Sequence, residues 1–106
     1  TSPLFAREAF WCIHNTMKKA FASVTAYHVY VPSFGDWGFN MACQGPCDPA
    51  AAGDAVPGLK YYSPETFRKS LHFPADSAAS ITDINTFNRP VLYSYYLKGW
   101  KYYMEM

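Results

Sequence analysis

The stretch from His28 to Ala42, HVYVPSFGDWGFNMA, decides what kind of fold this chain can form. It contains a β-branched and aromatic run, a short segment with proline and glycine, and a second apolar run. Such runs predict two strands, and a connection this short makes them antiparallel neighbours. We place the first strand over Ser23–Val31, where Pro32 ends it, and the second over Trp37–Ala42.

The turn between these strands is rich in aromatic side chains beside glycine. Phe34 and Trp37 flank Gly35, and glycine allows another group to approach the backbone closely. One interpretation is that the turn is the wall of a site for a flat or aliphatic ligand. The other is that it is a structural turn whose aromatic rings fill the core.

A helix is expected before the first strand, from about Pro3 to Ala20. Ser2 suits the N-cap position and Pro3 the first helical position. The apolar residues then recur with a period of 3.6 residues, which places one apolar face on the helix: Phe10, Ile13, Met17 and Phe21.

The second half of the chain alternates loops and helices. The Gly/Pro/Ala-rich segment 43–58 predicts a flexible surface loop, and Leu59–Tyr62 a short extended piece. Ser63-Pro64 predicts the start of a helix that runs to about Leu71, and residues 75–87 form a loop or a short helical turn. A last helix follows Pro90, with an aromatic stripe that favours packing over a partner or membrane-interface surface: Tyr93, Tyr95, Tyr96, Trp100, Tyr102 and Tyr103.

The composition limits the classes of function. The chain has 106 residues, enough for one small domain, and 19% of them are aromatic, so an apolar patch that needs a partner is expected. The formal net charge is +1 and Lys18-Lys19 is the only adjacent basic pair, which argues against nucleic-acid binding. No apolar run approaches the length of about 18 residues that spans a bilayer. Because the chain begins at Thr1 without a methionine, we expect a piece of a longer protein.

The cysteines do not predict a metal site or a disulfide framework. Their number is three, which is odd and fits a reducing compartment. Cys43 and Cys47, even with His28 or His72, do not have the spacing of a zinc site, so we interpret them as two free thiols.

Two other candidates for chemistry have simpler explanations. Cys12, His14 and Asn15 are close in a helix and point in different directions, so they do not form a nucleophilic set. Cys12 is expected to be a buried apolar residue. His28 is expected to be half-buried and hydrogen-bonded to a neighbour, with a minor role in substrate binding left open.

Three blocks of the sequence resemble the polyamine aminopropyltransferases, the spermidine synthase family. They are TSP with the aromatic helix FWCI (residues 1–3 and 10–13), the turn block 31–42, and LKYYSPE with the downstream FP (residues 59–65 and 73–74). The turn matches best a sub-branch that reads Pro-Ser-Phe-Gly-x-Trp-Gly-Phe and is often preceded by membrane-spanning helices. The resemblance covers most of the chain up to Phe73-Pro74.

This resemblance implies that residues 1–106 are the C-terminal segment of a Rossmann-like, methyltransferase-type α/β domain. The family transfers an aminopropyl group from decarboxylated S-adenosylmethionine to a diamine. In the family the Gly-rich nucleotide loop and the Asp-rich catalytic motif lie upstream, and neither motif occurs here. The resemblance therefore implies no catalytic residue in this segment, which should be inactive alone, and it leaves the cofactor-binding residues unknown. No metal ligand is expected either, because of the cysteine spacing.

The resemblance also implies a substrate-binding role for the turn. It points to Ser33, Phe34, Asp36 and Trp37 as residues of the amine site. Phe34 stands where the family has a tyrosine whose hydroxyl helps to bind the amine, and Trp37 replaces a smaller apolar residue. Because that hydroxyl is missing, a non-catalytic binding module of a degenerate paralogue is an alternative, and a different amine or nucleotide thioether is a third.

The expected partners follow from the same reasoning. The parent protein would bind a polyamine substrate, and no nucleic acid. The strand pair would form the edge of a larger sheet, and an exposed sheet edge predicts a homo-oligomer, for example a dimer across that edge. The expected location is the cytoplasm, or the cytoplasmic face of a membrane if the parent has upstream membrane-spanning helices.

Overall fold

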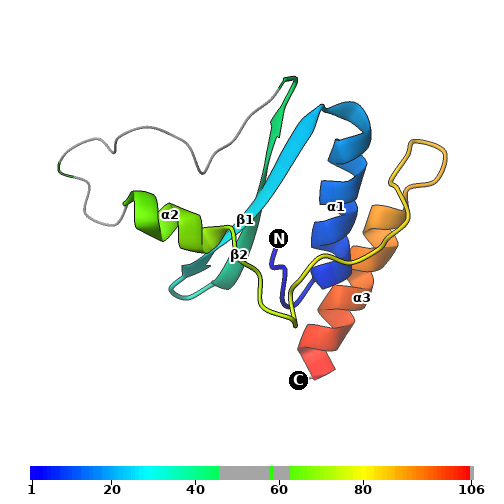
Figure 1. Cartoon of the computed structure of the whole chain (residues 1–106). Coiled ribbons are helices and arrows are strands. Elements are labelled where there is room, and N and C mark those ends of the chain that lie inside the picture. The colour runs from blue at the N-terminus through cyan, green and yellow to red at the C-terminus, as the bar shows by residue number, and fades with distance from the viewer. Residues whose placement is uncertain (46–57, 59–62, 106) are drawn as a thin grey trace.

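The computed structural model describes residues 1–45, 58 and 63–105 of the chain. These residues form three helices and one antiparallel strand pair, in the order α1–β1–β2–α2–α3. Figure 1 shows the strand pair with α2 on one side and α1 and α3 on the other. The expected α/β class, with a long helix, a strand pair and two further helices, is confirmed for this part of the chain.

The strand pair is a regular hairpin. Strand β1 spans Ser23–Val31, as predicted, and β2 spans Gly35–Cys43. The pairing runs without interruption from Val31 opposite Gly35 to Ser23 opposite Cys43. Strand β2 begins two residues earlier than predicted, because Gly35 adopts a φ of +84° and returns the chain to the pairing directly after the turn.

The hairpin has two unlike faces, since side chains alternate along a strand. On the face that meets α1, which we call the closed face, Gly38 lies so near Phe10 that an added Cβ would be 2.3 Å from the ring. On this face Oδ1 of Asn40 also accepts a 2.7 Å hydrogen bond from Nδ1 of His14 of α1. The other face, the open face, carries side chains that are 36–46% exposed: Val29, Trp37, Phe39 and Met41.

Helix α1 spans Arg7–Ala20, so it begins four residues later than predicted. The hydroxyl of Ser2 accepts hydrogen bonds from the backbone N–H groups of Leu4 and Phe5, which closes a separate turn. Ala6 then has φ −121° and ψ 51°, which is not helical. Ser2 therefore caps this separate turn and not helix α1, which it was predicted to cap.

Helix α1 is buried on more than the one predicted face. Four consecutive residues are buried: Ala9, Phe10, Trp11 and Cys12. The reason is that the hairpin, α3 and a segment between α2 and α3 all pack on this helix. The described residues have their core here, and Phe10, Trp11 and Phe73 form an aromatic cluster with ring centroids 5.0–5.9 Å apart.

Residues 77–85, which we call the strap, run along α1 without forming a helix. Side chains of α1 bind its backbone carbonyl groups: Trp11 Nε1 donates to Ser77 at 2.9 Å, and Asn15 Nδ2 donates to Ser80 at 3.1 Å. Arg7 Nε donates to the carbonyl of Ala78 at 2.9 Å. These three donors are four residues apart in sequence, so they lie along one side of the helix.

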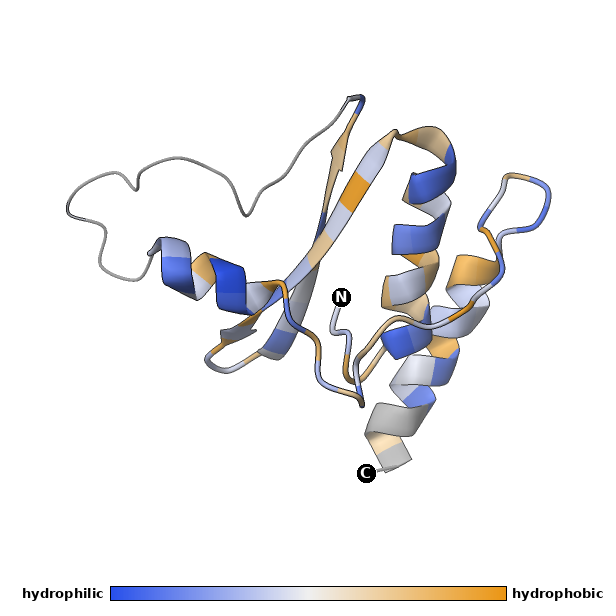
Figure 2. Ribbon diagram, in the orientation of Figure 1, coloured by the Kyte–Doolittle hydropathy of each residue, from blue (hydrophilic) through white to orange (hydrophobic). Residues whose placement is uncertain are grey.

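Helix α2 spans Pro64–Ser70, close to the prediction. The hydroxyl of Ser63 accepts a 3.1 Å hydrogen bond from the N–H of Thr66, and Pro64 occupies the first turn. None of its residues is buried, and Figure 2 shows it as mainly hydrophilic. The predicted extended piece 59–62, and the predicted loop 43–58 apart from its first residues and residue 58, lie outside the described residues.

Helix α3 spans Val91–Glu105 and packs on α1. At Gly99 an added Cβ would lie 3.0 Å from the Cα of Ala6, and Lys98 forms a 2.7 Å ion pair with Glu8. The aromatic stripe is only partly covered, since several side chains are 41–74% exposed: Tyr93, Tyr96, Leu97, Trp100 and Met104. Among the described residues, no helix is long and apolar enough to cross a bilayer.

The cysteines correct one expectation. Cys12 is free and buried, as predicted, and its thiol donates to the carbonyl of Asp83 at 3.4 Å. Cys43, which we expected to be a free thiol, is disulfide-bonded. An odd number of cysteines does not exclude a disulfide, because pairing two of three leaves one free.

Candidate substrate-binding turn

The turn at the end of the hairpin is defined by its own backbone. The N–H of Phe34 donates to the carbonyl of Val31 at 3.0 Å. Pro32 occupies the second position and Ser33 the third, with a φ of +77°. Proline followed by a residue with positive φ is the pattern of a type II turn, which usually has glycine at the third position. Ser33 therefore holds a conformation that costs an L-residue about 1 kcal/mol.

This turn exposes its two aromatic side chains. Phe34 is 71% exposed and Trp37 is 39% exposed. Their ring centroids are 6.4 Å apart at an interplanar angle of 70°, an edge-to-face arrangement. The structure thus brings Ser33, Phe34 and Trp37 together at the tip of the hairpin, and the two rings do not fill the core of the described residues.

Asp36, the fourth predicted site residue, lies on the closed face. Register places it beside His28 and away from Trp37, its neighbour in sequence. Its carboxylate oxygens lie 2.8 and 3.0 Å from His28 Nδ1. The carboxylate is therefore already occupied by an imidazole.

His28 is half-buried and bonded to neighbours, as predicted. Besides Asp36, it contacts the carbonyl oxygen of His72 through Nε2, at 2.5 Å. Its ring lies against Phe73, with centroids 4.4 Å apart. The sequence reasoning missed this ring and carbonyl behind His28, because they come from a segment 44 residues further along the chain.

Most other carboxylates of the described residues are also engaged in ion pairs. Glu65 pairs with Lys69 at 3.5 Å, Asp83 with Arg89 at 3.2 Å, and Glu8 with Lys98. Among the described residues there is no group of three or more histidine, cysteine or acidic side chains that could hold a metal ion.

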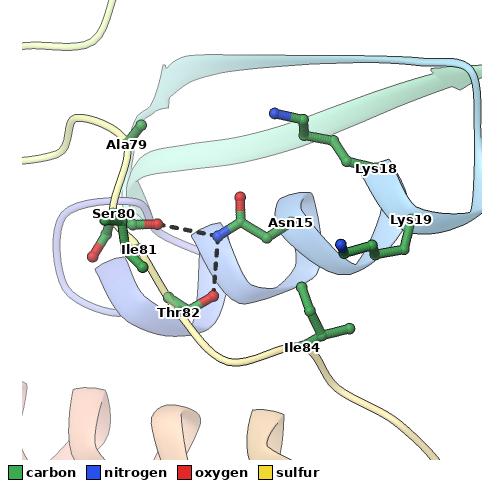
Figure 3. A pocket seen from close by; sticks show the side chains of 8 residues that line it. All are labelled: Asn15, Lys18, Lys19, Ala79, Ser80, Ile81, Thr82 and Ile84. Atoms are coloured by element: carbon green, nitrogen blue, oxygen red, sulfur yellow. Dashed lines mark hydrogen bonds between the residues drawn. The ribbon is translucent and has the colours of Figure 1, made fainter.

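A cavity lies away from the turn, between the end of α1 and the strap. Figure 3 shows this cavity of about 520 Å³, with the amide of Asn15 bonded to Ser80 and to the hydroxyl of Thr82. Lys18 and Lys19 line it, and no acidic side chain does. A cationic amine would meet positive charge there, so the turn is the better candidate for an amine site.

Comparison with known proteins finds relatives whose sequences align with nearly the whole of this chain. The polyamine aminopropyltransferase of Leptospira interrogans is 37% identical over 94% of this chain. The polyamine aminopropyltransferase of Mycobacterium tuberculosis strain H37Rv is 33% identical over 93%, and polyamine aminopropyltransferase 2 of Ralstonia nicotianae is 31% identical over 94%. No protein-family model and no solved structure matches.

The match is nearly complete for this chain and partial for its relatives. The chain spans about a fifth of the length of the curated relatives that it matches: 20%, 19% and 20% of these three proteins. The resemblance found in the three sequence blocks is confirmed, and it extends beyond Phe73-Pro74 into α3. The chain belongs to the spermidine synthase-like, polyamine aminopropyltransferase family.

Proposed function

We propose that this chain is the C-terminal portion of an aminopropyltransferase and that its hairpin turn forms one wall of the amine site. The reaction would move an aminopropyl group from decarboxylated S-adenosylmethionine to a diamine. The observation that carries the proposal is the exposed pair of Phe34 and Trp37 at the turn, in a chain whose relatives are named polyamine aminopropyltransferases.

The chemistry of the turn suits a cationic, partly aliphatic substrate. A protonated amine is attracted to the face of an aromatic ring, most strongly to tryptophan, and the methylene groups of a diamine gain from contact with apolar rings. Trp37 offers such a face beside Phe34, and both side chains remain accessible, at 39% and 71% exposed. Phe34 has no hydroxyl, so recognition here would rely on ring faces and shape.

The catalytic groups are proposed to lie in the remainder of the full-length protein. Proton transfer from the attacking amine needs an available acid–base group. Four described carboxylates lie against basic side chains: Asp36, Asp83, Glu8 and Glu65. Asp76 is exposed, but it lies in the segment after α2 and outside the turn. The hairpin would be the edge of a Rossmann-like sheet, and the upstream part would cover the open face. The 106-residue chain alone would then show no turnover.

The test is Trp37→Ala in the full-length gene product, assayed for aminopropyl transfer to putrescine. Loss of a cation–π contact worth about 1.4 kcal/mol would raise the KM for the amine about tenfold, with a smaller effect on the KM for the nucleotide. Tyr93→Ala is the matched control, since Tyr93 is an exposed aromatic residue of α3 and lies outside the turn. Unchanged kinetics in Trp37→Ala would count against the turn as an amine wall.

A second candidate is a non-catalytic binding module, and the missing hydroxyl at Phe34 favours it. In that case calorimetry would detect diamine binding that depends on Trp37, while no transfer would be measured at any enzyme concentration. Restoring the hydroxyl with Phe34→Tyr separates the two candidates further. It should tighten amine binding in either case, but it should increase turnover only in an enzyme.

A further inference from the structure

Both ring nitrogens of His28 are engaged by neighbouring oxygen atoms. Its Nδ1 lies 2.8 and 3.0 Å from the two carboxylate oxygens of Asp36, and its Nε2 contacts the carbonyl oxygen of His72. The imidazole is therefore held from both ends, by a side chain of β2 and by a backbone carbonyl that follows α2.

These contacts join three parts of the molecule. His28 belongs to β1, Asp36 lies two residues after the turn in β2, and His72 follows α2. The ring is held from a further side by Phe73, which itself packs on Phe10 and Trp11 of the core. The side chains of His28 and Asp36 are 18% and 21% exposed, so solvent competes only partly for these hydrogen bonds.

We propose that His28 and Asp36 are positioning residues that hold the aromatic turn in place. Asp36 precedes Trp37 in the same strand, and adjacent side chains point to opposite faces. An anchored Asp36 on the closed face therefore sets where Trp37 stands on the open face, and with it the Phe34–Trp37 pair. This proposal rests on the proposed function in one respect: it takes the amine as the ligand that the Phe34–Trp37 pair binds.

The proposal assigns Asp36 a role different from direct binding of the amine. A direct ligand would make Asp36→Asn much more harmful than any change at His28. A shared positioning role makes His28→Gln and Asp36→Asn equally harmful and makes the double variant no worse than either, because each single change already breaks the pair.

The first readout is structural and needs no activity. The indole N–H resonance of Trp37 is recorded in ¹⁵N-labelled full-length protein and assigned by its disappearance in Trp37→Phe. We expect His28→Gln and Asp36→Asn to shift or broaden this resonance. The control is His14→Gln, which removes another histidine bonded to β2, at Asn40, and should leave the Trp37 resonance in place. If the Trp37 resonance is unchanged in both His28→Gln and Asp36→Asn, the positioning role is wrong.

The second readout is the split between kinetic constants. His28→Gln and Asp36→Asn should each raise the KM for putrescine about fivefold, and the double variant should raise it by the same factor. Additive effects, or an effect of Asp36→Asn alone, would overturn the proposal. Absence of transfer in the wild type would refute the proposed function instead, and the indole resonance would still decide whether the two residues hold the turn.

Discussion

The two faces of the β1–β2 hairpin share a backbone but differ in what covers them. On the closed face, Gly38 is buried against Phe10 and Asn40 bonds to His14, so the packing leaves no room for an added methyl group. On the open face, Trp37 and its neighbours on β1 and β2 stay substantially exposed, and α2 contacts this face through Phe67, whose ring lies against Tyr27.

The difference separates residues that make the fold from residues available for function. Removing atoms or adding volume on the closed face disturbs the packing of α1, whereas the open face has few contacts to lose within the described residues. Apolar groups that remain exposed often mark a surface that a ligand or partner covers. Substitutions should therefore affect stability on one face and binding on the other.

The largest expected effect is that of Gly38→Ala on the closed face. The new Cβ would lie 2.3 Å from an atom of the Phe10 ring, and Phe10 is 1% exposed, so the ring has no free space to enter. Overpacking of this kind costs about 3 kcal/mol of the free energy of unfolding, measured by denaturant titration of the full-length gene product. Gly45→Ala is the control, since apart from its chain neighbours no heavy atom of the described residues lies within 4 Å of its added Cβ. Equal stability of the two variants would mean that the closed face is not tightly packed.

The next effect compares two tryptophans, one under the closed face and one on the open face. Trp11→Phe removes the Nε1–H that donates to the buried carbonyl of Ser77, so this carbonyl loses its partner. The expected loss is about 2 kcal/mol, from the unpaired acceptor and the smaller ring. Trp37→Phe should cost less than about 0.5 kcal/mol, as is usual for exposed positions. A similar loss for both would show that the open face contributes to folding as much as the closed face.

Much of this comparison could be predicted from the sequence, because local signals determine the hairpin. The alternation of apolar residues and the Pro–Gly turn place β1 and β2 within two residues. The separation of Asp36 from Trp37 onto opposite faces was not predicted, because the predicted second strand began only at Trp37. Ser63-Pro64 marked the start of α2 for a similar reason, since capping depends on a few adjacent residues.

The rest depends on contacts between distant segments, which no local pattern contains. Arg7, Trp11 and Asn15 have a spacing of four residues, a signal of one helix side, but nothing in residues 77–80 reveals that their carbonyl groups are the partners. The contact of His28 with His72 and Phe73 is hidden for the same reason. The separate turn before α1 was missed because Ser2-Pro3 is also the pattern of a helix start.

The smallest expected effect concerns the pH dependence of the closed face, at His14. Burial lowers the pKa of His14 below its ordinary value of 6.5; the hydrogen bond with Asn40 opposes this shift and the charge of Lys18 adds to it. The unfolded chain therefore binds a proton at a higher pH than the folded chain, so stability rises with pH between the two values. This contribution to stability is complete above pH 6.5 and is lost as the pH falls below that value.

The variant His14→Gln tests this dependence, because glutamine keeps a hydrogen-bonding side chain that does not titrate. The unfolding midpoint of His14→Gln should therefore fall less than that of the wild type between about pH 7 and about pH 5. The difference should be small, because the ring is only half-buried and water screens its charge. A steeper fall in His14→Gln than in the wild type would mean that the protonated imidazole is the favoured form against β2, and that this part of the closed face is wetter than its packing indicates.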